Sequence, residues 1–203
     1  MQENPFRTLH RITYKRLRFI LKFVAIMVPV VFLVSAIWVG MQDSISAFYH
    51  TPMRNLFVGV IVAMAMCLLA YTGYNDLENR SMNAASLFLL GIALAPTHAP
   101  AGSSNWDLPL VHNLCAYAFF LLVAYVCWYG RKHGLEPAGK KSGDFYGISF
   151  ESARKFTAWL MLAVLLVAIL LFSAGRLGWF QIPYTIFILE AIGLWIFALY
   201  WHI

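Results

Sequence analysis

The sequence predicts an all-α integral membrane protein, a bundle of six transmembrane helices with both ends of the chain on the cytoplasmic side. Three observations predict this class. Hydrophobic residues make up 61% of the 203 residues and charged residues only 12%, which is about half the charge of a soluble domain. The apolar residues gather in six long runs, and the basic residues between those runs alternate between many and few.

The six runs define the predicted helices. Each run holds about 16–23 residues, near the ~20 that a helix needs to cross a hydrocarbon core about 30 Å thick. The predicted spans are residues 18–40, 55–74, 82–97, 108–129, 156–175 and 182–201. Six spans leave no room for a second domain, so residues 1–203 are expected to form one transmembrane domain.

The first run follows a basic stretch and is too long for the apolar part of a signal peptide, with no clear cleavage site. We therefore expect it to remain as an uncleaved helix. The second and third helices each carry two small residues four positions apart, Gly59 with Ala63 and Gly91 with Ala95. Such pairs let neighbouring helices approach closely.

The fourth and fifth helices are separated by the one long polar segment, residues 130–155, which we expect to be a flexible cytoplasmic loop. The three cysteines, Cys67, Cys115 and Cys127, lie inside predicted helices without C-x-x-C spacing. They are predicted to be small packing residues rather than parts of a disulfide or a sulfur metal site.

The basic residues orient the bundle. Six precede or begin the first helix, Arg80 lies between the second and third, and six lie between the fourth and fifth. The alternate gaps hold only Arg54 and Arg176. The positive-inside rule therefore places both termini in the cytoplasm. The net charge of +6 follows from this bias, so we expect membrane lipids and not nucleic acid as partners.

Glu190 is the costliest residue in the chain, because it lies about 12 Å inside the last predicted helix. An ionisable group at that depth costs a few kcal/mol unless it is paired. We expect it to face the bundle interior, with Arg54, His50 or His112 as its partner. The alternative is a carboxyl group that only holds two helices together.

Other polar residues are expected to gather with Glu190 on the outer face. The expected ligand-binding residues are Ser44, Ser46, Tyr49, His50, Arg54, His112 and Glu190. Three helices also point their electropositive N-terminal ends there, each with a proline near its first turn: Pro52, Pro109 and Pro183. These features predict a site for an anion such as a lipid phosphate or a carboxylate.

The same residues permit a metal site. Three histidine ligands and a water ligand are typical of catalytic zinc, and His50, His98 and His112 would supply the ligands. Glu190 or Asp43 would act as base or fourth ligand. Ser46 lies four residues before His50, so it is a candidate nucleophile. Glu190 and Ser46 are therefore the candidate catalytic residues of a zinc-dependent membrane hydrolase.

Short motifs along the chain resemble those of a known family. They are SISAFYHTPMRNLFVG at 44–59, YTGY at 71–74, ALAPT at 93–97, AYAFF at 116–120 after His112, and IFALYW at 196–201 after Glu190. Together they resemble a family of small bacterial six-span membrane proteins whose function is not established. The resemblance implies six spans, an outward polar motif and the bacterial inner membrane.

More distantly, residues 44–46 and the glutamate in the last helix are similar to the DRAM/Sfk/Frag group of lipid-remodelling membrane proteins. Ser46 and His50 are similar to the S-x-x-x-H of the CREST group, which includes the alkaline ceramidases, membrane hydrolases with zinc. This chain lacks the H-x-x-x-H in its last helix and the aspartate that follows the first histidine in that group.

Three functions follow as hypotheses. The first is a membrane protein whose outward-facing pocket binds a lipid headgroup or a similar anion. The second is a zinc-dependent hydrolase of a lipid amide or ester. The third is an accessory subunit of a larger membrane complex, or a homo-oligomer, that packs through its small-residue faces.

Overall fold

The computed structural model describes residues 5–73, 75–99, 107–129, 150–177 and 182–202. Within these ranges the chain forms six α-helices and one short 3-10 helix, η1, and no strand. The elements are α1 (Pro5–Val39), η1 (Ser46–His50), α2 (Arg54–Ala70), α3 (Asp76–Leu94), α4 (Pro109–Tyr129), α5 (Phe150–Arg176) and α6 (Thr185–His202). The prediction of an all-α protein is confirmed for the part of the chain described.

Four helices are long and apolar enough to cross a membrane: α1 (over Thr13–Val39), α4, α5 (over Glu151–Gly175) and α6. Helix α2 is also apolar but shorter than these four. Helix α3 begins with the charged residues Asp76, Glu78 and Arg80. The chain is therefore a helical bundle with four helices that have the length and composition of membrane spans.

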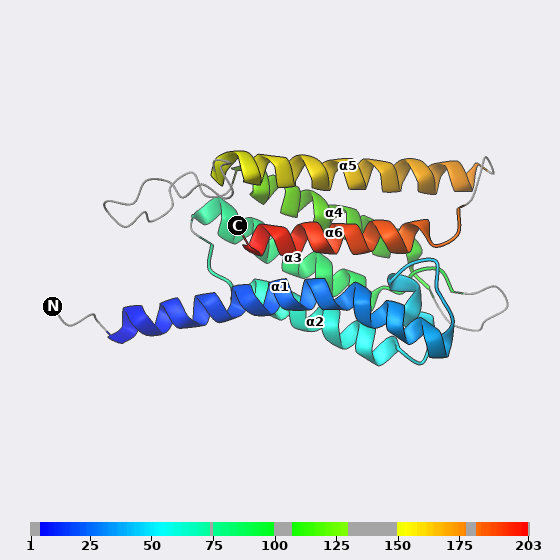
Figure 1. The fold of residues 1–203 in the computed structure, drawn as a ribbon, viewed down its shortest axis with the longest axis horizontal. Helices are drawn as coiled ribbons and strands as arrows, with labels where there is room; N and C mark the ends of the chain where they lie inside the picture. Colours follow the sequence, from blue (N-terminus) through cyan, green and yellow to red (C-terminus); the bar gives the residue numbers. More distant parts are fainter. Residues whose placement is uncertain (1–4, 74, 100–106, 130–149, 178–181, 203) are drawn as a thin grey trace.

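Successive helices run in opposite directions, so α1 begins and α6 ends at the same end of the bundle (Figure 1). We call the end that holds η1 the η1 end. Along the bundle, α3 packs between α2 and α4, and α1 packs against α6. The fifth helix packs on both α4 and α6, which make few direct contacts with each other. This bridging position of α5 leaves room for a cavity among the three helices.

Most predicted boundaries shift by a few residues, and three helices begin much earlier than predicted; one of them is α3, which begins at Asp76 instead of residue 82. The first helix begins at Pro5, well before the predicted start, and α5 begins at Phe150 within the predicted loop. The start of α5 is held by an i,i+4 ion pair, with Lys155 Nζ 2.6 Å from Glu151 Oε1. The rest of that predicted loop, 130–149, lies outside the described residues.

Arg154 is buried and joins the start of α5 to the end of α4. Its guanidinium donates from Nε to the Cys127 carbonyl at 3.1 Å and from Nη2 to the Trp128 carbonyl at 3.0 Å. These are carbonyls of the last turn of α4, which has no further helical turn to bond them. A basic residue counted as a topological signal therefore also caps a helix.

The α3–α4 contact depends on a missing side chain. A Cβ atom at Gly91 would lie 2.5 Å from Cys115 Sγ and 3.3 Å from Cys115 Cβ. Gly91→Ala is therefore expected to destabilise the protein by about 1–3 kcal/mol through overpacking. The thermal midpoint in detergent checks this.

The double variant Gly91→Ala/Cys115→Ala is expected to recover most of that loss, because the clashing sulfur is gone. Gly59→Ala is the matched control, since nothing lies within 4 Å of a Cβ atom there. An equal effect of the two glycine substitutions would contradict the close-packing explanation. Of the two predicted small-residue pairs, only the one containing Gly91 makes a close contact within the described part of the chain.

Candidate functional site

A cavity of about 700 Å³ lies among α4, α5 and α6. Its α4 wall is formed by residues on one helical face, from His112 to Phe120. On α5, the lining residues recur every three or four positions from Met161 to Gly175. On α6, they include Leu189 and Gly193. A volume of this size falls within the roughly 300–1,000 Å³ of small-molecule sites.

The cavity is polar at the η1 end and apolar along its depth. The polar groups at its mouth are Asp43, Ser44, Ser46, Thr97, His98, His112, Asn113, Thr185 and Glu190. The wall contributed by α5 is apolar along its whole length, for example at Val164, Leu165 and Phe172. Its shape and polarity therefore match an amphiphilic molecule.

Glu190, the sixth residue of α6, lies at the boundary between these two regions and is partly buried. Its Oε2 accepts a hydrogen bond from the Ile45 N–H at 2.6 Å, and its Oε1 accepts one from Ser46 Oγ at 3.1 Å. Its partners therefore differ from the predicted Arg54, His50 and His112. The Ile45 N–H just before η1 has no partner within that helix and donates to Glu190 instead, a feature that residue types alone do not reveal.

The segment that precedes η1 is fixed to α6 and to itself. The Phe187 N–H donates to the Asp43 carbonyl at 2.9 Å, and Ser44 Oγ accepts from the Ala47 N–H at 2.9 Å. Together with the two bonds to Glu190, these contacts hold the segment over the mouth of the cavity. Glu190 therefore has a structural role as well as a position on the cavity wall.

His112, the fourth residue of α4, is buried on the cavity wall and lies close to the end of α3. Its Nδ1 lies 2.7 Å from the Ala95 carbonyl oxygen. A carbonyl only accepts, so Nδ1 carries a proton and Nε2 is the acceptor of the neutral ring. The side chain thus joins α3 and α4 while it lines the cavity.

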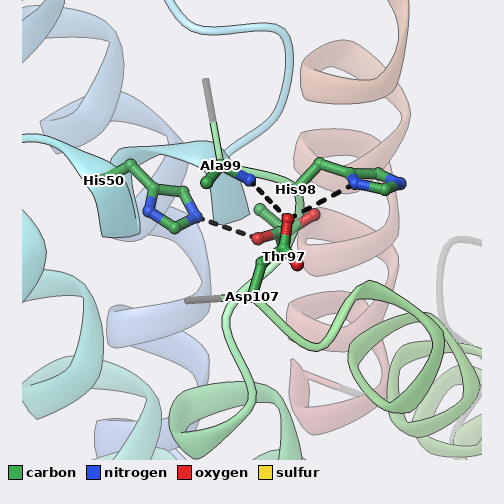
Figure 2. A network of polar contacts seen from close by, with 5 residues as sticks. All are labelled: His50, Thr97, His98, Ala99 and Asp107. Atoms are coloured by element: carbon green, nitrogen blue, oxygen red, sulfur yellow. Dashed lines mark hydrogen bonds and ion pairs between the residues drawn. The ribbon is translucent and has the colours of Figure 1, made fainter. Parts of the chain in front are cut away.

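The other two outer histidines have separate partners (Figure 2). His50 Nε2 lies 2.9 Å from the Thr97 carbonyl oxygen, and His98 Nδ1 lies 3.6 Å from Asp107 Oδ2. The Ala99 N–H donates to the same Asp107 oxygen at 3.1 Å. These contacts join η1 to the end of α3 and tie residues 97–99 to Asp107. Of the two histidines, only His98 lines the cavity.

Arg54 and Tyr49 pair with each other outside the cavity lining. Arg54 Nη2 donates to Tyr49 Oη at 2.7 Å, and its guanidinium lies 4.5 Å from the centre of the Tyr49 ring. The structure thus brings Ser44, Ser46, His112 and Glu190 together at the cavity. It does not bring His50, Tyr49 and Arg54 there.

The helix starts match the predicted prolines only in part. Pro109 is the first residue of α4, whereas Pro52 and Pro183 precede α2 and α6 by two residues. At the start of α6, the Phe187 and Ile188 N–H groups already donate to the carbonyls of Asp43 and Tyr184.

The predicted zinc ligands do not form a ligand set. His50, His98 and His112 each contact a different partner: the Thr97 carbonyl, Asp107 and the Ala95 carbonyl. Among the residues that the structure describes, no group of three or more His, Cys, Asp or Glu side chains is arranged to hold a metal ion. The geometry therefore gives no support to a zinc site or to the hydrolase hypothesis, which stays a prediction. The three cysteines are free.

Glu78, which the sequence did not single out, forms a second polar cluster at the opposite end of the bundle. It is fully buried, and its Oε1 accepts hydrogen bonds from Tyr71 Oη at 3.0 Å and Tyr200 Oη at 2.9 Å. Tyr14 Oη lies 2.8 Å from Tyr71 Oη. The cluster joins α1, the end of α2, α3 and α6, and only the packing of these helices reveals it.

Comparisons with protein-family models, with characterised proteins and with solved structures found no match to this chain. The family resemblance drawn from the motifs therefore stays a prediction.

Proposed function

We propose that this protein is a membrane protein that binds a single-chain amphiphile in the cavity among α4, α5 and α6. The ligand's polar group would lie beside His112, Ser44 and Glu190, and its hydrocarbon chain would extend along α5. The observation that carries the proposal is the division of one continuous cavity into a polar mouth and an apolar interior.

The dimensions of the cavity support a hydrocarbon ligand. The lining residues of α5 extend from Met161 to Gly175, which at 1.5 Å per residue is about 21 Å. One leaflet contributes about half of a hydrocarbon core that is about 30 Å thick. An acyl chain of ordinary membrane length therefore fits along this wall.

We further propose that all six helices cross the inner membrane of a bacterium with both termini in the cytoplasm. The bias of basic residues supports this orientation, and so does the alternation of the helices in Figure 1. In this orientation the mouth of the cavity faces the non-cytoplasmic side. Cysteine-accessibility labelling of single introduced cysteines on the two sides of intact cells tests it.

Filling the apolar part of the cavity tests the binding function. Ala168 lines the cavity from α5, whereas Ala163 on the same helix is exposed and outside the lining. Ala168→Phe is expected to reduce co-purified or added single-chain lipid by about tenfold, because the new ring occupies the space of the hydrocarbon chain. Native mass spectrometry of protein purified in mild detergent measures the bound fraction.

Ala163→Phe is the matched control and is expected to leave the bound fraction unchanged, since it adds the same ring to the outer face of the same helix. Equal lipid occupancy in the wild-type protein and both variants would contradict the proposal. Occupancy that falls only in Ala168→Phe would support it.

A further inference from the structure

The charged and polar groups at the mouth of the cavity bear on which headgroup the site accepts, an inference that rests on the proposed amphiphile site. Its described lining includes two acidic residues, Asp43 and Glu190, and neither lysine nor arginine. The one basic residue of the nearby segment, Arg54, donates to Tyr49 and lies outside the lining. Among the described lining residues, the Lys, Arg, Asp and Glu side chains thus carry only negative formal charge, the reverse of what a lipid phosphate or a carboxylate requires.

The Glu190 carboxyl group already accepts the hydrogen bonds that an anionic ligand would need from this segment. Both of its oxygens accept hydrogen bonds, from the Ile45 N–H at 2.6 Å and from Ser46 Oγ at 3.1 Å. The donors of this outer segment are thus used by a group of the chain itself. An anionic ligand would enter beside this carboxyl group without those donors.

Some of the N–H groups at the helix starts near the mouth already bond carbonyl groups of the chain. The Phe187 N–H at the start of α6 donates to the Asp43 carbonyl, and the His112 N–H at the start of α4 donates to the Leu108 carbonyl. A helix N-terminus attracts an anion chiefly through N–H groups that lack partners. Because these two N–H groups already have partners, neither can bond an incoming anion.

Three of the remaining groups at the mouth can accept hydrogen bonds from a ligand. His112 keeps its Nδ1 proton on the Ala95 carbonyl at 2.7 Å, so the other ring nitrogen accepts. The exposed Asp43 side chain accepts on both oxygens when it is ionised. Ser44 Oγ, which accepts from the Ala47 N–H, retains a hydroxyl proton and can both donate and accept.

From this arrangement we infer that the cavity selects an amphiphile whose headgroup donates hydrogen bonds and carries no negative charge. A polyol headgroup such as glycerol has this chemistry, and its hydroxyl groups would bond His112 and the acidic residues at the mouth. Specificity then comes from repulsion of anions as much as from attraction of the ligand.

The test compares two probes with the same oleoyl chain, a monooleoyl glycerol and its phosphate ester, added at equal concentration to the full-length protein in mild detergent. Native mass spectrometry measures the bound fraction of each. The neutral probe is expected to bind at least about tenfold more tightly, because a phosphate about 4 Å from the Asp43 carboxylate near a protein surface is repelled by more than a tenfold difference in affinity requires. Asp43→Asn is expected to narrow this preference several-fold, because it removes one negative charge and leaves the backbone carbonyl in place.

Two kinds of failure are distinguishable. If both probes bind equally, or the phosphate ester binds more tightly, and Ala168→Phe blocks both, the headgroup inference is overturned while the cavity proposal stands. If neither probe binds in a way that Ala168→Phe prevents, the proposed function itself is overturned. A neutral preference that Asp43→Asn leaves unchanged would overturn the electrostatic explanation.

Discussion

Glu78→Ala is expected to be strongly destabilising, lowering the free energy of unfolding by about 3–5 kcal/mol. The substitution removes the acceptor of the Tyr71 and Tyr200 hydroxyl groups, which bond Glu78 Oε1 at 3.0 and 2.9 Å. Loss of a buried hydrogen-bond acceptor costs about 1–3 kcal/mol for each donor, although Tyr71 Oη keeps its contact with Tyr14 Oη at 2.8 Å. The thermal midpoint should fall by roughly 10 °C, since 1 kcal/mol corresponds to about 2–4 °C in a chain of this size.

A thiol-reactive dye in detergent measures this unfolding, because the three free cysteines become accessible as the bundle opens. Glu78→Gln keeps one carboxamide oxygen as acceptor and is expected to cost about 1 kcal/mol. Tyr14→Phe removes only the outermost hydroxyl of the cluster, 2.8 Å from Tyr71 Oη, and should have a similarly small effect. A melting curve of Glu78→Ala that matches that of Tyr14→Phe would show that the cluster contributes little.

Glu190→Ala is expected to release the segment over the cavity mouth and to cost about 2–3 kcal/mol. The variant loses the acceptor of the Ile45 N–H and of Ser46 Oγ. A buried donor that loses its acceptor costs about 1–3 kcal/mol. Trypsin cleavage after Arg54, the first residue of α2, should become faster because the preceding segment is no longer fixed to α6.

Ser46→Ala is the matched control, because it removes only the longer of the two bonds, at 3.1 Å, and should cost about 1 kcal/mol or less. Glu190→Gln retains an acceptor for the Ile45 N–H and should keep most of the stability. Wild-type stability and cleavage rate in Glu190→Ala would argue against the role of this residue in holding the segment.

The position of Glu190 shows how far residue chemistry carries a prediction. Depth in an apolar helix correctly indicated that it faces the bundle, because an unpaired carboxyl group is costly in a membrane. Its partners were predicted among charged side chains, whereas the structure gives the Ile45 N–H and a serine hydroxyl. Backbone donors have no signature in the sequence, so only the conformation of η1 reveals them.

The histidines show a limit of predicting a site from topology. His50, His98 and His112 were grouped because predicted topology placed them on one face, yet each bonds a different group within the described residues. Sharing a face restricts distance along the membrane normal and leaves lateral position open. Lateral positions depend on which helices pack together, and this order is not encoded in hydropathy.

The sequence by itself determined the helical class and the approximate positions of the helices, because apolar length and composition act locally along the chain. It also grouped Ser44, Ser46, His112 and Glu190, which line one cavity in the structure. Only the tertiary structure decided that Arg54 lies apart, that α5 bridges α4 and α6 over a cavity, and that Glu78 is buried among tyrosines. These features depend on contacts between residues far apart in the chain, and such contacts are fixed by side-chain packing between helices.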